Sequence, residues 1–133
     1  MKIRLRLAVL AALAAFGLSA HAEAAEPVVI GELNSYTALA AFTHPYRNGW
    51  QLALDEINAG GGVLGRPLQV VSRDDGAKPA EAVTVANELV ARAGARILFG
   101  TLLSNVGLAV ADFANQRNVV FLASEPLTDT IAW

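Results

Sequence analysis

Cysteine is absent from all 133 residues of the sequence, and histidine occurs only at His21 and His44. Without cysteine the chain has no disulfide framework, no thiol nucleophile and no lipid-modified N-terminal cysteine. The nucleophile elbow GxSxG and the phosphate-binding P-loop are missing as well. Because the remaining residues form no recognisable catalytic set, we predict that the protein is not an enzyme.

Basic residues are concentrated at the N-terminus. Three of the first six residues are basic, residues 7–18 are all small or apolar, and an Ala-His-Ala motif occupies positions 20–22. This order is typical of a cleavable secretory signal peptide, and the apolar run is shorter than the ~20 residues that span a membrane. We predict a signal peptide over residues 1–22 and a mature chain that starts at Glu23. The mature protein should reach the periplasm and not span the membrane itself.

Cleavage of this leader removes three basic residues and no acidic one, which changes the formal net charge from −2 to −5. An acidic domain without a basic stripe is a poor binder of nucleic acid, so no nucleic-acid partner is expected. Residues 23–133 have the length of one typical domain.

Helical apolar stripes alternate with short apolar runs after the leader. Strands that alternate with helices indicate parallel pairing through right-handed crossovers. Continuous apolar strands indicate that both faces of the sheet are covered. The expected strands are residues 28–33, 68–73, 97–99 and 119–123. The expected helices are residues 47–59, residues 79–93 and a third helix that buries Val106, Ala109, Val110, Phe113 and Ala114.

The segment 48–75 reads NGWQLALDEINAGGGVLGRPLQVVSRDD. Trp50, Ala53, Leu54 and Ile57 lie at i, i+3, i+4 and i+7, so they should form the buried face of the first helix. The following glycines stop that helix, because glycine accepts the left-handed conformation of a helix end. They also match the dinucleotide fingerprint GxGxxG, but that fingerprint requires a strand before a helix, and here the helix comes first. No cofactor is therefore expected.

This ordered pattern, NG…DEINA-GGG-LGRPL-V…DD, resembles the first lobe of type 1 periplasmic binding proteins. It is most similar to the leucine/isoleucine/valine-binding family of ABC-transporter substrate-binding proteins, over roughly residues 28–130. The resemblance implies an α/β fold, with an open parallel sheet of strand order 2-1-3-4 and helices on both faces. Because family members are about three times as long and have two lobes, it also implies that residues 23–133 are an incomplete N-terminal lobe. The sequence alone does not distinguish a fragment from a complete short product.

Ligands of open parallel sheets bind beyond the carboxyl ends of the strands. One loop there, residues 101–105, leads into the third helix, whose free amides favour an anion. The family places its ligand-carboxylate serine in this loop, and Ser104 occupies that position. In the alternative interpretation, Ser104 or Asn105 is only the N-cap of the helix.

Two other loops depart from the family pattern. Glu125 and Leu127 replace a small Ala/Gly- and Thr-containing turn. The Glu125 carboxylate either accepts a hydrogen bond from an ammonium, amide or hydroxyl group of a ligand or is a solvated loop acid. The segment around Tyr36 replaces a Ser/Thr-Gly turn, and Phe42 matches a ligand-facing aromatic position or else closes the core. His44 and Pro45 are expected in a surface loop.

Two neighbouring carboxylates, Asp74 and Asp75, follow the second strand, but no third ligand lies at metal-binding spacing. We expect them to cap a loop, and we expect no metal.

The resemblance implies an extracytoplasmic receptor of a branched-chain amino-acid-type ABC importer, which delivers a small amino-acid-like, amide or carboxylate ligand to an ABC permease in the inner membrane. The alternative is a sensory ligand-binding module of the same fold. The predicted ligand-binding residues are Tyr36, Phe42, Leu102, Leu103, Ser104, Asn105, Glu125 and Leu127.

The signal peptide can be tested directly. Mass spectrometry of the protein from the periplasmic fraction should find Glu23 at the N-terminus, because the Ala-His-Ala motif places the cut after residue 22. Recovery of a cytoplasmic product that retains Met1 would contradict the prediction.

Overall fold

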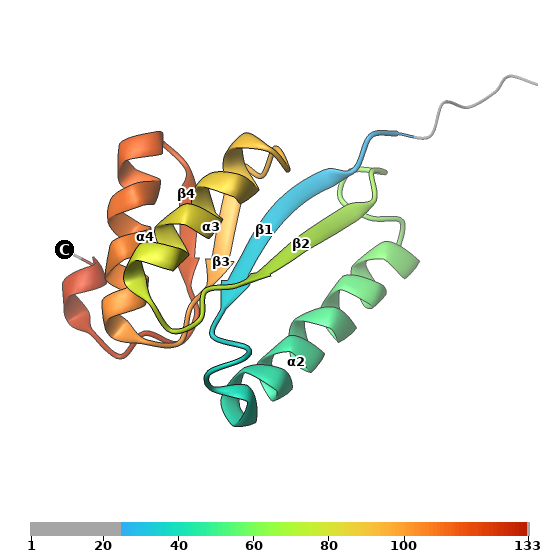
Figure 1. Cartoon of the computed structure of the whole chain (residues 1–133). Helices are drawn as coiled ribbons and strands as arrows, with labels where there is room; N and C mark the ends of the chain where they lie inside the picture. Colours follow the sequence, from blue (N-terminus) through green and yellow to red (C-terminus); the bar gives the residue numbers. More distant parts are fainter. Residues whose placement is uncertain (1–24, 133) are drawn as a thin grey trace, which may run out of the picture.

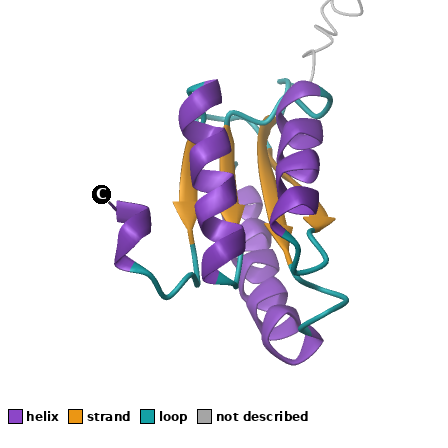
Figure 2. Cartoon of the chain, turned by 60° about the vertical axis from the view of Figure 1, so that its left-hand side comes forward, coloured by secondary structure: helices purple, strands orange, loops and turns teal. Residues whose placement is uncertain are grey.

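The computed structural model describes residues 25–132, so the predicted signal peptide lies outside the described residues. Four parallel strands form one open sheet in the order β2-β1-β3-β4. Helices α3 and α4 cover one face of this sheet, and α2 lies on the other (Figures 1 and 2). The predicted strand order and the helices on both faces are confirmed. The elements are β1 (Val28–Asn34), α2 (Ala40–Ala59), β2 (Leu68–Asp74), α3 (Pro79–Ala91), β3 (Ile97–Gly100), α4 (Ser104–Arg117), β4 (Val120–Ala123) and the short 3-10 helix η1 (Asp129–Ala132).

The hydrophobic core lies between the sheet and the two helices α3 and α4. The apolar stripes predicted for these helices face it, although Ala93 lies beyond the end of α3 and Ala109 is only half-buried. Burial of these side chains is the main favourable contribution to folding. The core residues are Leu33, Ala82, Val85, Ala86, Leu89, Ala95, Leu98, Val106, Val110 and Phe113.

Helix α2 begins at Ala40, seven residues before the predicted start, so the expected loop around His44 and Pro45 is wrong. Two features hid this start from sequence analysis. Pro45 lies inside the helix, where proline normally removes a hydrogen bond. The N-cap residue, Leu39, makes no side-chain capping hydrogen bond, so the usual Ser, Thr, Asp or Asn signal is missing.

The other end of α2 follows the glycine signal. Gly61 and Gly62 are left-handed, with φ of 99° and 75°. The amide of Gly62 donates to the carbonyl of Ile57 at 2.9 Å, and that of Gly61 to the carbonyl of Asn58 at 3.0 Å. These paired bonds form a Schellman motif, which satisfies the last carbonyls of the helix.

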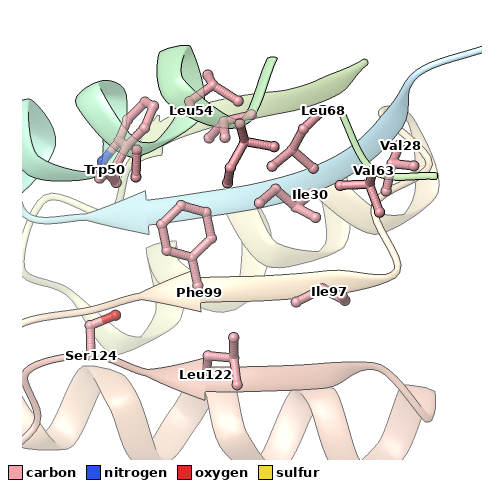
Figure 3. Close-up of a pocket in the computed structure, with 13 residues that line it drawn as sticks. Val28, Ile30, Trp50, Leu54, Val63, Leu68, Ile97, Phe99, Leu122 and Ser124 are labelled. Atoms are coloured by element: carbon pink, nitrogen blue, oxygen red, sulfur yellow. The ribbon is translucent and has the colours of Figure 1, made fainter. Parts of the chain in front are cut away.

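The inner face of α2 points at the sheet as predicted but is poorly buried. Thr43 is its only buried residue, and the Ile57 side chain is 41% exposed. A hollow of about 440 Å³ separates α2 from the sheet, and residues of α2 and of all four strands line it (Figure 3). Beside it, Val120 and Leu122 of β4 remain more than half exposed. One face of the sheet is thus covered only in part, and the expected burial of the α2 stripe is wrong in extent.

The strands β1 and β3 approach closely at their carboxyl ends. A Cβ on Gly100 would lie 2.2 Å from the carbonyl oxygen of Leu33, and Gly100 has φ of 118°. The next residue, Thr101, donates its amide to the same carbonyl at 2.8 Å. Thr101 has φ of 62°, which is strained for a β-branched residue. Glycine at position 100 is therefore required both by space and by backbone conformation.

Alanine substitution at two glycines should have opposite effects on stability. Gly100→Ala should lower the free energy of unfolding by about 2 kcal/mol or more, because the new methyl group meets backbone at a disfavoured φ. Gly49→Ala should raise it by roughly 0.5–1 kcal/mol, since Gly49 lies within α2 and nothing is within 4 Å of its added Cβ. Urea unfolding of both variants measures the difference, and equal stabilities would contradict the close approach of β1 and β3.

Candidate ligand-binding crevice

A second hollow, of about 270 Å³, lies at the carboxyl edge of the sheet and is the candidate ligand-binding crevice. Six of the eight predicted ligand-binding residues line it, and Leu39 is the one lining residue that sequence analysis missed. The lining residues are Leu39, Phe42, Leu102, Leu103, Ser104, Glu125 and Leu127.

Phe42 belongs to this hollow and not to the core. Its side chain is 63% exposed and projects from the first turn of α2, so the alternative in which Phe42 closes the core is wrong. An exposed aromatic ring beside a hollow can pack on the apolar body of a ligand.

The turn after β4 reaches the hollow because it packs tightly against α4. A Cβ on Gly107 would lie 2.5 Å from the Pro126 side chain, so only glycine admits this contact. Pro126 lies between Glu125 and Leu127, and both of these residues line the hollow. The small residue in α4 thereby sets the position of one wall.

Ser104 is the first residue of α4, and it does not cap the helix. The N-cap residue is Leu103, in an extended conformation and without a side-chain hydrogen bond to the helix. The alternative in which Ser104 or Asn105 is only an N-cap is therefore wrong. The first amides of α4 have no partner within the helix, and the Ser104 side chain lines the hollow beside them.

Glu125 is held by a residue that sequence analysis did not identify. The amide Nδ2 of Asn34 donates to Oε2 of Glu125 at 3.4 Å, and Asn34 is fully buried at the end of β1. Its own Oδ1 accepts the Ser35 amide at 2.9 Å, which fixes the orientation of the side chain. The only signal in the sequence is a polar residue directly after an apolar strand.

Tyr36 and Asn105 do not line the hollow. The Tyr36 side chain is only 5% exposed, and its ring lies beneath the Arg47 guanidinium, 3.5 Å from the ring centroid. Asn105 is exposed on the outside of α4. The structure therefore does not bring these two predicted residues together with the other six.

Residues 27–132 match the family described as periplasmic binding protein. The chain belongs to this family. BraC3, a Leu/Ile/Val-binding protein of Rhizobium johnstonii, is 33% identical over 123 residues, which are 92% of this chain and 32% of that protein. An amino acid binding protein of Pseudomonas aeruginosa is 35% identical over 112 residues, 84% of this chain and 29% of that protein. The resemblance expected from residues 48–75 is thus confirmed.

The solved structures that the chain resembles include substrate-binding proteins of branched-chain amino acid ABC transporters. LivJ of Streptococcus pneumoniae, in complex with isoleucine, matches with a TM-score of 0.75 and 30% identity, over 80% of this chain and 31% of that chain. A solute-binding protein of Rhodopseudomonas palustris, in complex with 3,4-dihydroxybenzoic acid, matches with a TM-score of 0.72 at 24% identity, over 79% and 29% of the two chains; this likeness shows the fold alone. The chain spans about a third of the length of the relatives that it matches.

The curated relatives are named as binding proteins and LivJ as the substrate-binding protein of a transporter, which supports at the family level the prediction that the chain is not an enzyme. No helix within residues 25–132 is long and apolar enough to cross a membrane.

A buried carboxyl group lies near the carboxyl end of β1. Glu32 is fully buried in β1, accepting hydrogen bonds from the Tyr36 hydroxyl at 2.7 Å and from the Ser72 hydroxyl. The indole of Trp50 donates to the Tyr36 hydroxyl at 3.3 Å. Burial raises the pKa of Glu32 from its ordinary value of 4.5 to about 7, because the two hydroxyls and the Arg47 charge compensate only in part for lost solvation.

The two carboxylates after β2 shape the neighbouring loop. Asp74 accepts hydrogen bonds from the amides of Thr37 and Gly76. Burial works against its charge, but these bonds prevail and hold the pKa of Asp74 below its ordinary value. Asp75 accepts from the Ser35 hydroxyl and the Ala77 amide, while burial raises its pKa. The expected role of this pair as loop caps is confirmed.

The buried Glu32 predicts a pH-dependent stability. A carboxyl whose pKa is higher in the folded than in the unfolded state binds a proton on folding, so stability should rise as the pH falls from about 7 to about 4.5. The gain should reach up to about 3 kcal/mol over this range. Urea unfolding at several pH values measures the slope.

The matched variant is Glu32→Gln, which keeps the shape of the side chain but cannot titrate in this range. Its stability should lack this rise between pH 7 and 4.5. A variant with the same slope as the parent protein would show that Glu32 does not carry the effect.

Proposed function

We propose that the chain is the first lobe of an extracytoplasmic receptor that binds a small amino-acid-like or carboxylate ligand and delivers it to an ABC permease. The observation that carries this proposal is the hollow at the carboxyl edge of the sheet, where Phe42, Ser104 and Leu127 come together from three segments of the chain. This is the edge at which open parallel sheets bind ligands. The relatives named for leucine, isoleucine and valine support the same ligand class.

The chemistry of the hollow suits a ligand with an apolar body and one anionic end. Five of the seven lining side chains are apolar, so they favour an aliphatic or aromatic body. The Ser104 hydroxyl and the unpaired amides of α4 supply hydrogen-bond donors for a carboxylate oxygen. No bond needs to be formed or broken for such a ligand to be held.

The one-sided shape of the hollow supports the idea that a second lobe completes the receptor. The residues that line it, Ser104 among them, form one wall only, while good sites bury most of a small ligand. In the complete receptor, a second lobe would close over the ligand by a hinge motion.

Export through the predicted signal peptide would place this receptor in the periplasm. The family to which the chain belongs is that of periplasmic binding proteins, which supports this location.

Substitution of Ser104 tests the proposed ligand contact. In the exported receptor, Ser104→Ala should weaken the binding of leucine or isoleucine about ten- to hundredfold. The reason is that the charge-assisted hydrogen bond from the Ser104 hydroxyl to the ligand carboxylate is lost. The melting temperature of the empty protein should hardly change, since Ser104 makes no capping hydrogen bond. Titration calorimetry and a thermal melt measure the two quantities.

The control is Thr84→Ala, which removes a hydroxyl from the exposed surface of α3, away from the hollow. It should leave the affinity unchanged. Loss of melting temperature without loss of affinity in Ser104→Ala would refute the ligand contact, and failure of the parent receptor to bind any small carboxylate would refute the proposed function.

A further inference from the structure

Glu125 presents a carboxylate to a hollow that is otherwise mostly apolar. It is only partly exposed, and it lines the hollow together with Phe42, Leu127 and other apolar side chains. A charged group beside apolar surface loses solvation and requires a partner to compensate. The contacts of Glu125 therefore indicate what the hollow is built to receive.

The protein supplies little of that compensation. Within the described part of the chain the one ion pair is between Arg92 and Glu88, so Glu125 has no cationic partner there. Its hydrogen-bond partner among these residues is Asn34, whose neutral amide donates over 3.4 Å. That distance exceeds the usual 2.9–3.0 Å of such bonds, and an ionised carboxylate can accept about four hydrogen bonds. The protein thus leaves most of the accepting capacity of Glu125 to solvent or to a ligand.

Asn34 is well suited to hold this carboxylate in place. Its side chain is fully buried, and Ser35 fixes its oxygen through a hydrogen bond of 2.9 Å, so the Nδ2 group can point only one way. The backbone carbonyl of Asn34 accepts the amides of Tyr36 and Asp75, which ties it to two loops. Asn34 therefore positions Glu125 without neutralising it.

Building on the proposed function, we propose that Glu125, positioned by Asn34, is a specificity determinant that receives a hydrogen-bond donor of the ligand. That donor is an ammonium or a hydroxyl group, while the ligand's carboxylate lies at Ser104 and its apolar body against Phe42 and Leu127. A ligand without the donor displaces solvent from the Glu125 carboxylate and adds no hydrogen bond to the one from Asn34. The receptor thereby rejects simple fatty or aromatic acids of the same shape.

The test uses two pairs of ligands that differ only in the donor. Leucine and 4-methylpentanoate test the ammonium group, and 4-hydroxybenzoate and benzoate test the hydroxyl group. In calorimetry with the exported receptor, one pair should show a preference of about tenfold or more for the member that carries the donor. The pair that does so identifies the class of donor.

Glu125→Gln, which keeps the shape and removes the charge, should reduce this preference about tenfold. It should leave the affinity for the donor-free member equal or higher. Asn34→Ala should reduce the preference as well, whereas a purely structural role would weaken both members alike. Asp129→Asn removes an exposed carboxylate outside the hollow and should leave the preference unchanged.

The outcomes separate this inference from the proposed function. Equal affinities within each pair, or a preference that survives Glu125→Gln, would overturn the role of Glu125 while the receptor function stands. A receptor that binds neither these four ligands nor any other small carboxylate would contradict the proposed function, and the inference would fall with it.

Discussion

The close approach of β3 to β1 is the constraint on which the crevice depends. Gly100 lies against the carbonyl of Leu33, and Thr101 donates its amide to the same oxygen, so the two strands end together. The chain must then turn at once, and the strained left-handed conformation of Thr101 makes this turn possible. Because β4 pairs with β3, the turn that carries Glu125 arrives at the same edge as Ser104. A shift of β3 would therefore displace two walls of the crevice together.

Burial of polar groups beneath the crevice adds a second constraint. Glu32 and Asp75 are both fully buried. Glu32 accepts from the hydroxyls of Tyr36 and Ser72, and Asp75 accepts from the Ser35 hydroxyl and the Ala77 amide. Such groups are costly unless their hydrogen bonds are made, so they link β1, β2 and the loop at Tyr36 in one arrangement. Tyr36, which sequence analysis assigned to the ligand, serves this polar layer instead.

Sequence analysis predicted the sheet well because its strands and the α3 and α4 stripes have strong apolar periodicity, and each observed strand boundary lies within one residue of its expected place. It failed at the start of α2, where Pro45 contradicts the helix rules and Leu39 offers no cap. It also overestimated the burial of Ile57. An apolar stripe shows which face of a helix points inward, but it does not show whether neighbouring side chains fill the space beside that face.

In the crevice, the loop around Ser104 was recognisable from its position between a strand and a helix. Asn34 was missed, since no local pattern reveals that a polar side chain at a strand end reaches a residue 91 positions away. Glu32 did carry a signal, as a single acid within an apolar strand.

The loose packing of α2 has a consequence for the dynamics of the lobe. Regions with few buried contacts open locally at a lower free-energy cost than the core, and Thr43 is the only buried residue of this helix. Its amides should accordingly exchange with solvent sooner than those of α3 and α4. Leu39 is the N-cap of α2, Phe42 lies in its first turn, and both line the crevice. A ligand that packs on them therefore binds the folded helix and should slow the exchange of its amides. The local opening of α2 and the binding of ligand are then coupled equilibria, so a change in one should appear in the other.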